Sequence, residues 1–86
     1  MIDFDAVTDC LIVQRDGAAI VKGRPSPHDN HLMLELDAGG AVVGLLLMSA
    51  SVRILSAWRA HPDRGLLPPD LLTEVDAWLE QRTPSP

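Results

Sequence analysis

The sequence predicts an α+β fold, in which a small antiparallel β-sheet of four to five strands, connected as a meander, precedes one or two C-terminal helices packed on the sheet. Short apolar runs separated by Gly, Asp and Pro turn signals occupy residues 1–49, and an amphipathic helical pattern occupies residues 69–82. With 86 residues the chain suits a single domain over 1–86. Within it we expect the sheet at 1–49, helices at 50–83 and a frayed tail at 84–86.

The first strands are predicted from β-forming residues next to turn signals. Residues 10–13, Cys-Leu-Ile-Val, form a short apolar run, and Arg15-Asp16-Gly17 follows with the Asp-Gly turn signal. Residues 18–21 then suit the second arm of a hairpin. Residues 24–30 contain Pro25 and Pro27, which predict a loop.

Two further strands flank a turn at residues 37–40, Asp-Ala-Gly-Gly. In residues 32–36 the even positions are Leu, and Glu35 falls on the other, wetter face. Residues 41–48 lack polar alternation, so we expect both faces of this strand to be covered, one by a helix and the other by a second copy of the chain. Gly44 within it predicts a bulge or a close backbone approach.

Residues 52–60 fit either a helix or a strand. Val52, Leu55 and Trp58 recur at helical steps of three, whereas Val52, Ile54 and Trp58 share strand parity. A Ser N-cap at position 49 or 51 and the stop at His61-Pro62 favour the helix.

The final helix carries the most local signals. Pro69 suits its first position, Asp70 and Glu74 lie near its positive end, and Arg82 lies near its negative end. One face is apolar at spacings of three and four, so we expect its side chains, Trp78 included, to be buried on the sheet; they are Leu71, Leu72, Val75, Trp78 and Leu79.

Composition excludes several classes of partner. Seven Lys and Arg stand against twelve Asp and Glu, a net charge of −5, which argues against nucleic acid. The longest uncharged stretch, residues 38–52, is too short to span a membrane, and Met1-Ile2-Asp3 does not open a secretion signal. One cysteine, Cys10, excludes an internal disulfide and fits a cytoplasmic location.

Two segments together resemble a family. Residues 4–13, Phe-Asp-Ala-Val-Thr-Asp-Cys-Leu-Ile-Val, are followed by an Asp-Ala-Gly-Gly-Ala-Val-Val-Gly turn and strand at 37–44 that ends in Ala50-Ser51. This pairing over residues 2–51 resembles the small bacterial proteins catalogued as domain-of-unknown-function family 2283.

The resemblance implies an antiparallel sheet whose last strand leads into a helix, and it implies no established activity. Some relatives resemble partners of small toxin-like proteins, which implies an antitoxin or other binding role. The chain departs from the family at Leu46, where relatives often have Glu, and in a longer C-terminal segment, residues 57–86.

Several acidic, histidine and cysteine side chains are candidates for acid–base, metal-binding or nucleophilic chemistry. Asp5 and Asp9 fit backbone-bonding turn residues better than paired acid–base carboxylates. The set His28, Asp29 and His31, with His61 and Asp63 distant in sequence, lacks the helical spacing of metal-binding histidines. Cys10 lies in an apolar run and fits a small core residue.

No catalytic, cofactor-binding or metal-binding residue is therefore predicted. Arg53, Arg59 and Arg64 fit a solvated face, since no aromatic platform accompanies them beyond Trp58. A core this small usually needs further support, so we expect a non-catalytic protein–protein interaction module that acts as a homodimer. The alternatives are an antitoxin-like regulator of a small toxic protein, and a weak metal-binding or minor enzymatic role at His28, Asp29 and His31.

Overall fold

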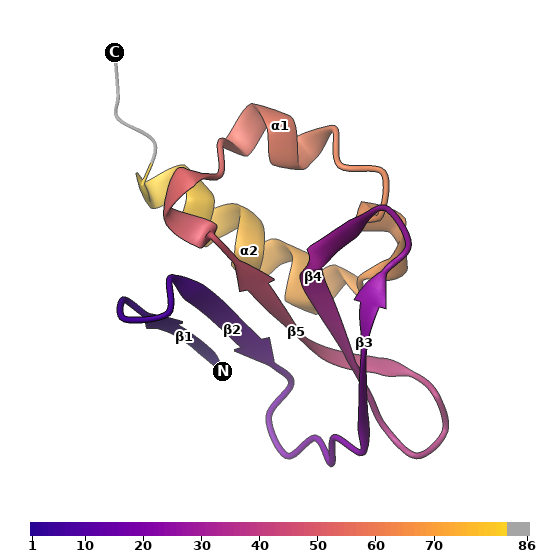
Figure 1. Cartoon of the computed structure of the whole chain (residues 1–86). Coiled ribbons are helices and arrows are strands. Elements are labelled where there is room, and N and C mark those ends of the chain that lie inside the picture. The colour runs from indigo at the N-terminus through magenta and orange to yellow at the C-terminus, as the bar shows by residue number, and fades with distance from the viewer. Residues whose placement is uncertain (83–86) are drawn as a thin grey trace.

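The computed structural model describes residues 1–82 and has an α+β fold, as predicted (Figure 1). One five-stranded antiparallel sheet is followed in the sequence by two α-helices and two short 3-10 helices. The elements in chain order are β1 (Ile2–Asp5), β2 (Cys10–Gln14), β3 (Lys22–Ser26), β4 (Asp29–Leu36), β5 (Val42–Met48), η1 (Ala50–Val52), α1 (Leu55–Arg59), η2 (Arg64–Leu66) and α2 (Pro69–Arg82). The tail expected at 84–86, and Thr83 before it, lie outside the described residues.

The strand order is β1-β2-β5-β4-β3, so a simple meander is wrong at one connection. β3, β4 and β5 follow one another as a meander, but β5 then pairs with β2 and closes the sheet in its centre. The chain therefore crosses from β2, next to one edge of the sheet, to β3 at the opposite edge (Figure 1).

The predicted hairpin after residues 10–13 is also wrong, although its turn forms. Gly17 has a φ of 74°, and the Ala18 amide donates to the Arg15 carbonyl at 3.1 Å. Residues 18–21 do not form a strand beside β2, because β5 offers β2 a far more apolar partner than this alanine-rich segment does, and the Val21 amide donates instead to the Leu36 carbonyl of β4 at 2.9 Å. The expected loop at 24–30 instead contains the end of β3, a two-residue turn at 27–28 and the start of β4. Pro25 is tolerated because β3 is an edge strand.

The core lies between one face of the sheet, called here the inner face, and the helices. Six inner-face side chains of the three central strands are completely buried, and they are Leu11, Val13, Leu32, Leu34, Leu45 and Leu47. Helical and loop side chains pack on them from one side, and they are Ala50, Trp58, Leu67, Leu71, Val75 and Leu79. Figure 1 shows α2 behind the sheet and α1 across the end at which β5 finishes.

α2 forms as predicted and buries Leu71, Val75 and Leu79. Trp78 differs from the expectation, because its ring is only half-buried at the margin of the core. It packs against Phe4 at a centroid distance of 5.1 Å, and the Arg82 guanidinium lies 4.6 Å from its centroid. The deeply buried tryptophan is Trp58, which is 2% exposed.

Residues 50–60 form two short helical pieces, η1 and α1, as favoured, but Arg53 and Ile54 between them are extended. The expected serine caps are wrong. Ser49 has a left-handed φ of 54° and makes no side-chain cap, while α1 begins after Ile54 without one. The Ser51 hydroxyl donates instead to Asp9 at 2.7 Å, which ties the β1–β2 turn to the exit of β5.

Gly44 marks a close approach, as its position in an apolar run predicted. Gln14 on β2 donates to Glu35 on β4 at 3.2 Å, and this hydrogen bond passes over Gly44 on the strand between them. A Cβ at Gly44 would lie 2.7 Å from Glu35 Oε1 and 3.0 Å from the Val13 carbonyl oxygen. The register between β4 and β5 also shifts beside it, between Glu35 and Leu36.

Gly44→Ala is expected to lower the free energy of unfolding by about 1–3 kcal/mol, because the added methyl group must displace backbone or break the Gln14–Glu35 bond. Urea denaturation followed by circular dichroism measures this. Gly65→Ala is the matched control, since a Cβ there meets nothing within 4 Å. Equal stability of the two variants would contradict the close approach at Gly44.

Candidate functional site

A partly buried polar cluster joins the start of β4 to the segments on either side of α1. The Asp29 carboxylate accepts from Arg53 Nη1 at 2.8 Å and from His61 Nε2 at 2.9 Å. Its other oxygen accepts from the His31 amide at 2.9 Å, and Arg53 Nε donates to the Met48 carbonyl at 3.3 Å. Partial burial raises the pKa of Asp29, but these hydrogen bonds and the Arg53 charge outweigh it and hold that pKa well below its ordinary value.

The hydrogen bonds around His61 define its neutral tautomer. The Asp63 amide donates to His61 Nδ1 at 3.0 Å, so this nitrogen acts as an acceptor and carries no proton. Nε2 therefore carries the hydrogen that it donates to Asp29. Both ring nitrogens are occupied, which leaves His61 no lone pair for a metal ion or a substrate proton.

His28 and Asp63 form a second imidazole–carboxylate pair beside this cluster. Asp63, with a side chain only 3% exposed, accepts from His28 Nδ1 at 2.7 Å and from the His28 amide at 2.9 Å. Burial raises the pKa of Asp63, but hydrogen bonds from the side chain and amide of His28 outweigh it and lower that pKa. The His28 ring is 63% exposed, and within residues 1–82 no hydroxyl or thiol is hydrogen-bonded to it. A nucleophile–base pair is therefore missing there.

The structure thus assembles four of the five residues weighed as a metal or acid–base set, namely His28, Asp29, His61 and Asp63. His31 contributes only its amide, and its side chain is exposed. In the described part of the chain, no group of three or more His, Cys, Asp and Glu side chains is arranged to hold a metal ion.

The three arginines predicted to form a solvated face are separated. Arg59 is exposed, but Arg53 belongs to the Asp29 cluster. Arg64 forms two hydrogen bonds with Asp76, at 2.7 and 3.0 Å, and lies 5.6 Å from the Trp58 ring centroid. Two of these cations are therefore structural partners of carboxylates.

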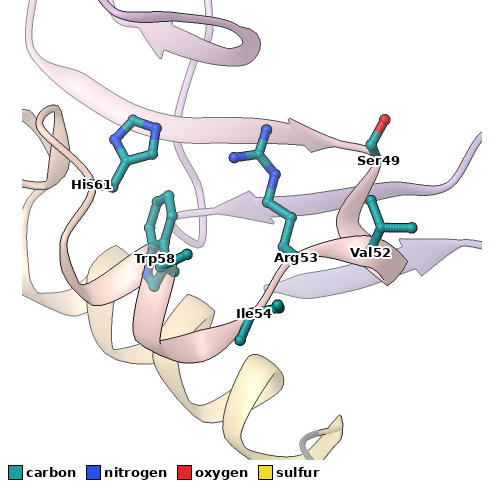
Figure 2. A pocket seen from close by; sticks show the side chains of 7 residues that line it. Ser49, Val52, Arg53, Ile54, Trp58 and His61 are labelled. Atoms are coloured by element: carbon teal, nitrogen blue, oxygen red, sulfur yellow. The ribbon is translucent and has the colours of Figure 1, made fainter.

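A cavity of about 360 Å³ lies between the end of β5 and α1 (Figure 2). Its wall is mainly apolar, and the lining residues are Ser49, Val52, Arg53, Ile54, Ala57, Trp58 and His61. Figure 2 shows the Arg53 guanidinium between His61 and Ser49, with Trp58 and Ile54 on the α1 side. Because Arg53 and His61 already bond Asp29, the cavity presents little unengaged polar chemistry.

Asp5 and Asp9 both bond backbone amides, as expected of turn residues. Asp5 accepts from the Val7 amide at 2.9 Å, within the β1–β2 turn. Asp9 reaches farther, because it accepts from the Ser51 amide at 3.0 Å and from the Ser51 hydroxyl. The two carboxylates therefore anchor backbone and do not share a reactive pocket.

The second candidate site is the opposite face of the sheet, called here the outer face. Its centre consists of five half-buried apolar side chains, Cys10, Ile12, Met33, Leu46 and Met48. Ile12, Leu46 and Met33 stand directly opposite one another on three neighbouring strands. Within residues 1–82 the helices pack on the inner face, so a single chain covers one side of residues 41–48, not both.

Acidic and amide groups border this apolar centre. Asp3, on β1, stands opposite Ile12 on β2. The next outer-face row consists of Gln14, Gly44 and Glu35, and in it Gln14 donates a hydrogen bond to Glu35. Lys22 and Arg24 on β3 pair with Leu36 and Leu34 on β4, so both side chains belong to the inner face. No Lys or Arg of the five described strands therefore occupies an outer-face position.

Cys10 lies on the outer face and not in the core. Partial burial raises the pKa of its thiol, and the negative charges of Asp5, Glu35 and Asp9 raise that pKa further. The thiol therefore stays protonated near neutral pH, which is the opposite of what a cysteine nucleophile requires.

No helix of residues 1–82 is both long and apolar enough to cross a membrane. Comparison of the chain with protein-family models, with curated proteins and with solved structures finds no match.

Proposed function

We propose that the protein is a non-catalytic protein–protein interaction module that acts as a homodimer through the outer face. The observation that carries this proposal is the row Ile12, Leu46 and Met33, three large apolar side chains at the centre of a sheet face on which no helix of residues 1–82 packs. Burying such area contributes about 25 cal/mol per Å². A second copy brings a face of the same shape and chemistry, which suits an isologous twofold contact.

The two sheet edges are less suited to association. β3 is an edge strand with Pro25, which lacks an amide donor, and with the exposed cations Lys22 and Arg24. β1, the other edge, has only four residues, two of them Asp3 and Asp5. Short strands, proline and charge are devices that discourage edge pairing, so the face is the better surface for a partner.

The polar groups support a non-catalytic role. His61 has both ring nitrogens engaged, Asp29 and Asp63 accept several hydrogen bonds each, and the Cys10 thiol has a raised pKa. A general base or nucleophile needs a free lone pair within reach of a substrate. The imidazole–carboxylate pairs instead fasten the segment after α1 to the start of β4.

Leu46→Lys is the direct test, because it places a cation at the centre of the outer face. Size-exclusion chromatography with light scattering at micromolar concentration is expected to show a dimer for the wild type and a folded monomer for the variant. Val7→Lys is the matched control, since Val7 is 95% exposed in the β1–β2 turn and is expected to leave the dimer intact. A monomeric wild type would refute the homodimer, and a dimeric Leu46→Lys would refute the use of this face.

A second candidate function is the antitoxin-like regulator, in which the same face binds a small basic protein. The outer-face carboxylates Asp3, Asp5 and Glu35, with no strand Lys or Arg among them, favour a cationic partner. Calorimetric titration with a small basic protein encoded beside this gene separates the two proposals. If the wild type is a monomer, binds the basic protein and loses that binding in Leu46→Lys, the result would support the regulator over the homodimer.

We further propose that the chain is a member of domain-of-unknown-function family 2283 and acts in the cytoplasm. The contact between Asp9 and Ser51 supports membership, because it joins one motif of the resemblance directly to the other. The lone protonated Cys10 thiol fits a reducing compartment.

A further inference from the structure

We propose that the two copies pack face to face about a twofold axis parallel to β5, so that β1 of each copy lies over β3 of its partner. This inference rests on the proposed homodimer and adds its geometry. A twofold axis that relates two facing sheets must lie in the plane between them. When the strands of the two sheets stay nearly aligned, the axis runs either along the strands or across them.

The charge distribution of the sheet distinguishes these two axes. Asp3 and Asp5 occupy outer-face positions of β1, because Asp3 stands opposite Ile12 and Asp5 opposite Cys10. An axis across the strands would place β1 over the partner's β1 and bring these carboxylates against their own copies. Like charges at such close range oppose association.

An axis along the strands removes that repulsion. It places the acidic edge β1 over the partner's β3, whose outer-face positions are Gly23 and Pro25. The same edge strand carries Lys22 and Arg24, but their register places them on the inner face, so they are not groups of this interface. When the sheet is turned about the strand direction, no strand carboxylate of the partner therefore lies over Asp3 and Asp5.

The same axis also places the apolar centres of the two copies over one another. β5 is the middle strand, so Leu46 lies near the axis and faces the Leu46 of its partner. β2 and β4 flank β5 on opposite sides, so Ile12 faces the partner's Met33. The flexible methionine side chain can fill the space beside the branched isoleucine.

Site-specific crosslinking tests this geometry. Ile12→Cys and Met33→Cys are made as separate variants in a Cys10→Ser background, and one is labelled with nitrogen-15 so that mass identifies mixed pairs. Packed sheets lie about 10 Å apart, too far for a disulfide, so a bifunctional thiol reagent of roughly 5 Å span is used. Separate variants are needed because positions 12 and 33 are also near one another within one chain, across β5.

After the two variants are refolded together, the mixed Ile12–Met33 product is expected to exceed both self-products several-fold. Leu46→Cys is the positive control, since it crosslinks to itself for either axis, and Val7→Cys is the negative control. Predominant Ile12 self-crosslinking, or no crosslink between positions 12 and 33 in a dimer verified by light scattering, would overturn the axis while leaving the homodimer intact. Monomeric variants and a monomeric wild type would overturn both proposals.

Discussion

Trp58→Ala is expected to lower the free energy of unfolding by about 3–5 kcal/mol, the largest effect of any single truncation in this chain. The Trp58 ring is 2% exposed and fills the core between α1, α2 and the inner face. Its Nε1 also donates to Asp76 at 2.7 Å, and this carboxylate in turn binds Arg64. Truncation therefore leaves a large cavity and removes a charge-assisted hydrogen bond.

The comparison with Trp78 makes this prediction specific. Trp78→Ala removes a ring of the same size that is only half-buried, so its cost in urea denaturation is expected to be clearly smaller. A domain with about 5 kcal/mol of stability would be largely unfolded by Trp58→Ala, so Trp58→Phe serves as a milder variant. A Trp78→Ala cost as large as that of Trp58→Ala would contradict the difference in burial between the two rings.

Asp29→Asn is expected to lower the free energy of unfolding by about 2–3 kcal/mol, because the bonds that Asp29 accepts are charge-assisted and largely shielded from water. The amide keeps the shape of the carboxylate but removes the charge that balances Arg53. Asp16→Asn is the matched control, since Asp16 is 92% exposed and bonds only the N-terminal amine. Its effect is expected to be small.

Acid titration provides a second measurement on the same variant. The pKa of Asp29 is lowered in the folded state, so its stabilisation is fully present above the unfolded pKa of about 3.9 and is lost as the pH falls below it. The difference between wild type and Asp29→Asn is therefore expected to be largest near neutral pH and to shrink below about pH 4. A difference independent of pH would contradict the role of the carboxylate charge.

Elements with strong local signals could be predicted from the sequence. The turn at 37–40, the strands on either side of it and the helix from Pro69 all carry their own turn, parity or capping residues, and all form. β3 could not be predicted in this way, because Lys-Gly-Arg-Pro-Ser contains no apolar alternation and owes its strand to pairing with β4. The neighbour of β2 also depends on which distant segment buries more apolar area.

The candidate sites were predictable only in part. Residue types indicated the histidine and aspartate set. The ion pair between Asp29 and Arg53 could not be predicted, because no sequence pattern around Arg53 indicates a contact with a carboxylate 24 residues away. The apolar outer face could be predicted from the alternation of side chains along each strand. Each central strand carries three consecutive apolar residues, at 11–13, 32–34 and 45–47, so each places one large side chain on the face away from the core.

The position of β5 between β2 and β4 also sets an order of assembly during synthesis. β2 leaves the ribosome about 30 residues before its partner β5. At a translation rate of about 5–20 residues per second, β2 therefore has no β5 to pair with for several seconds. A two-stranded hairpin such as β1–β2 is only marginally stable alone. The apolar segment at 10–13 therefore stays exposed to solvent until β5 pairs with β2. The growing polypeptide is therefore most exposed to chaperones in the interval before Met48 emerges.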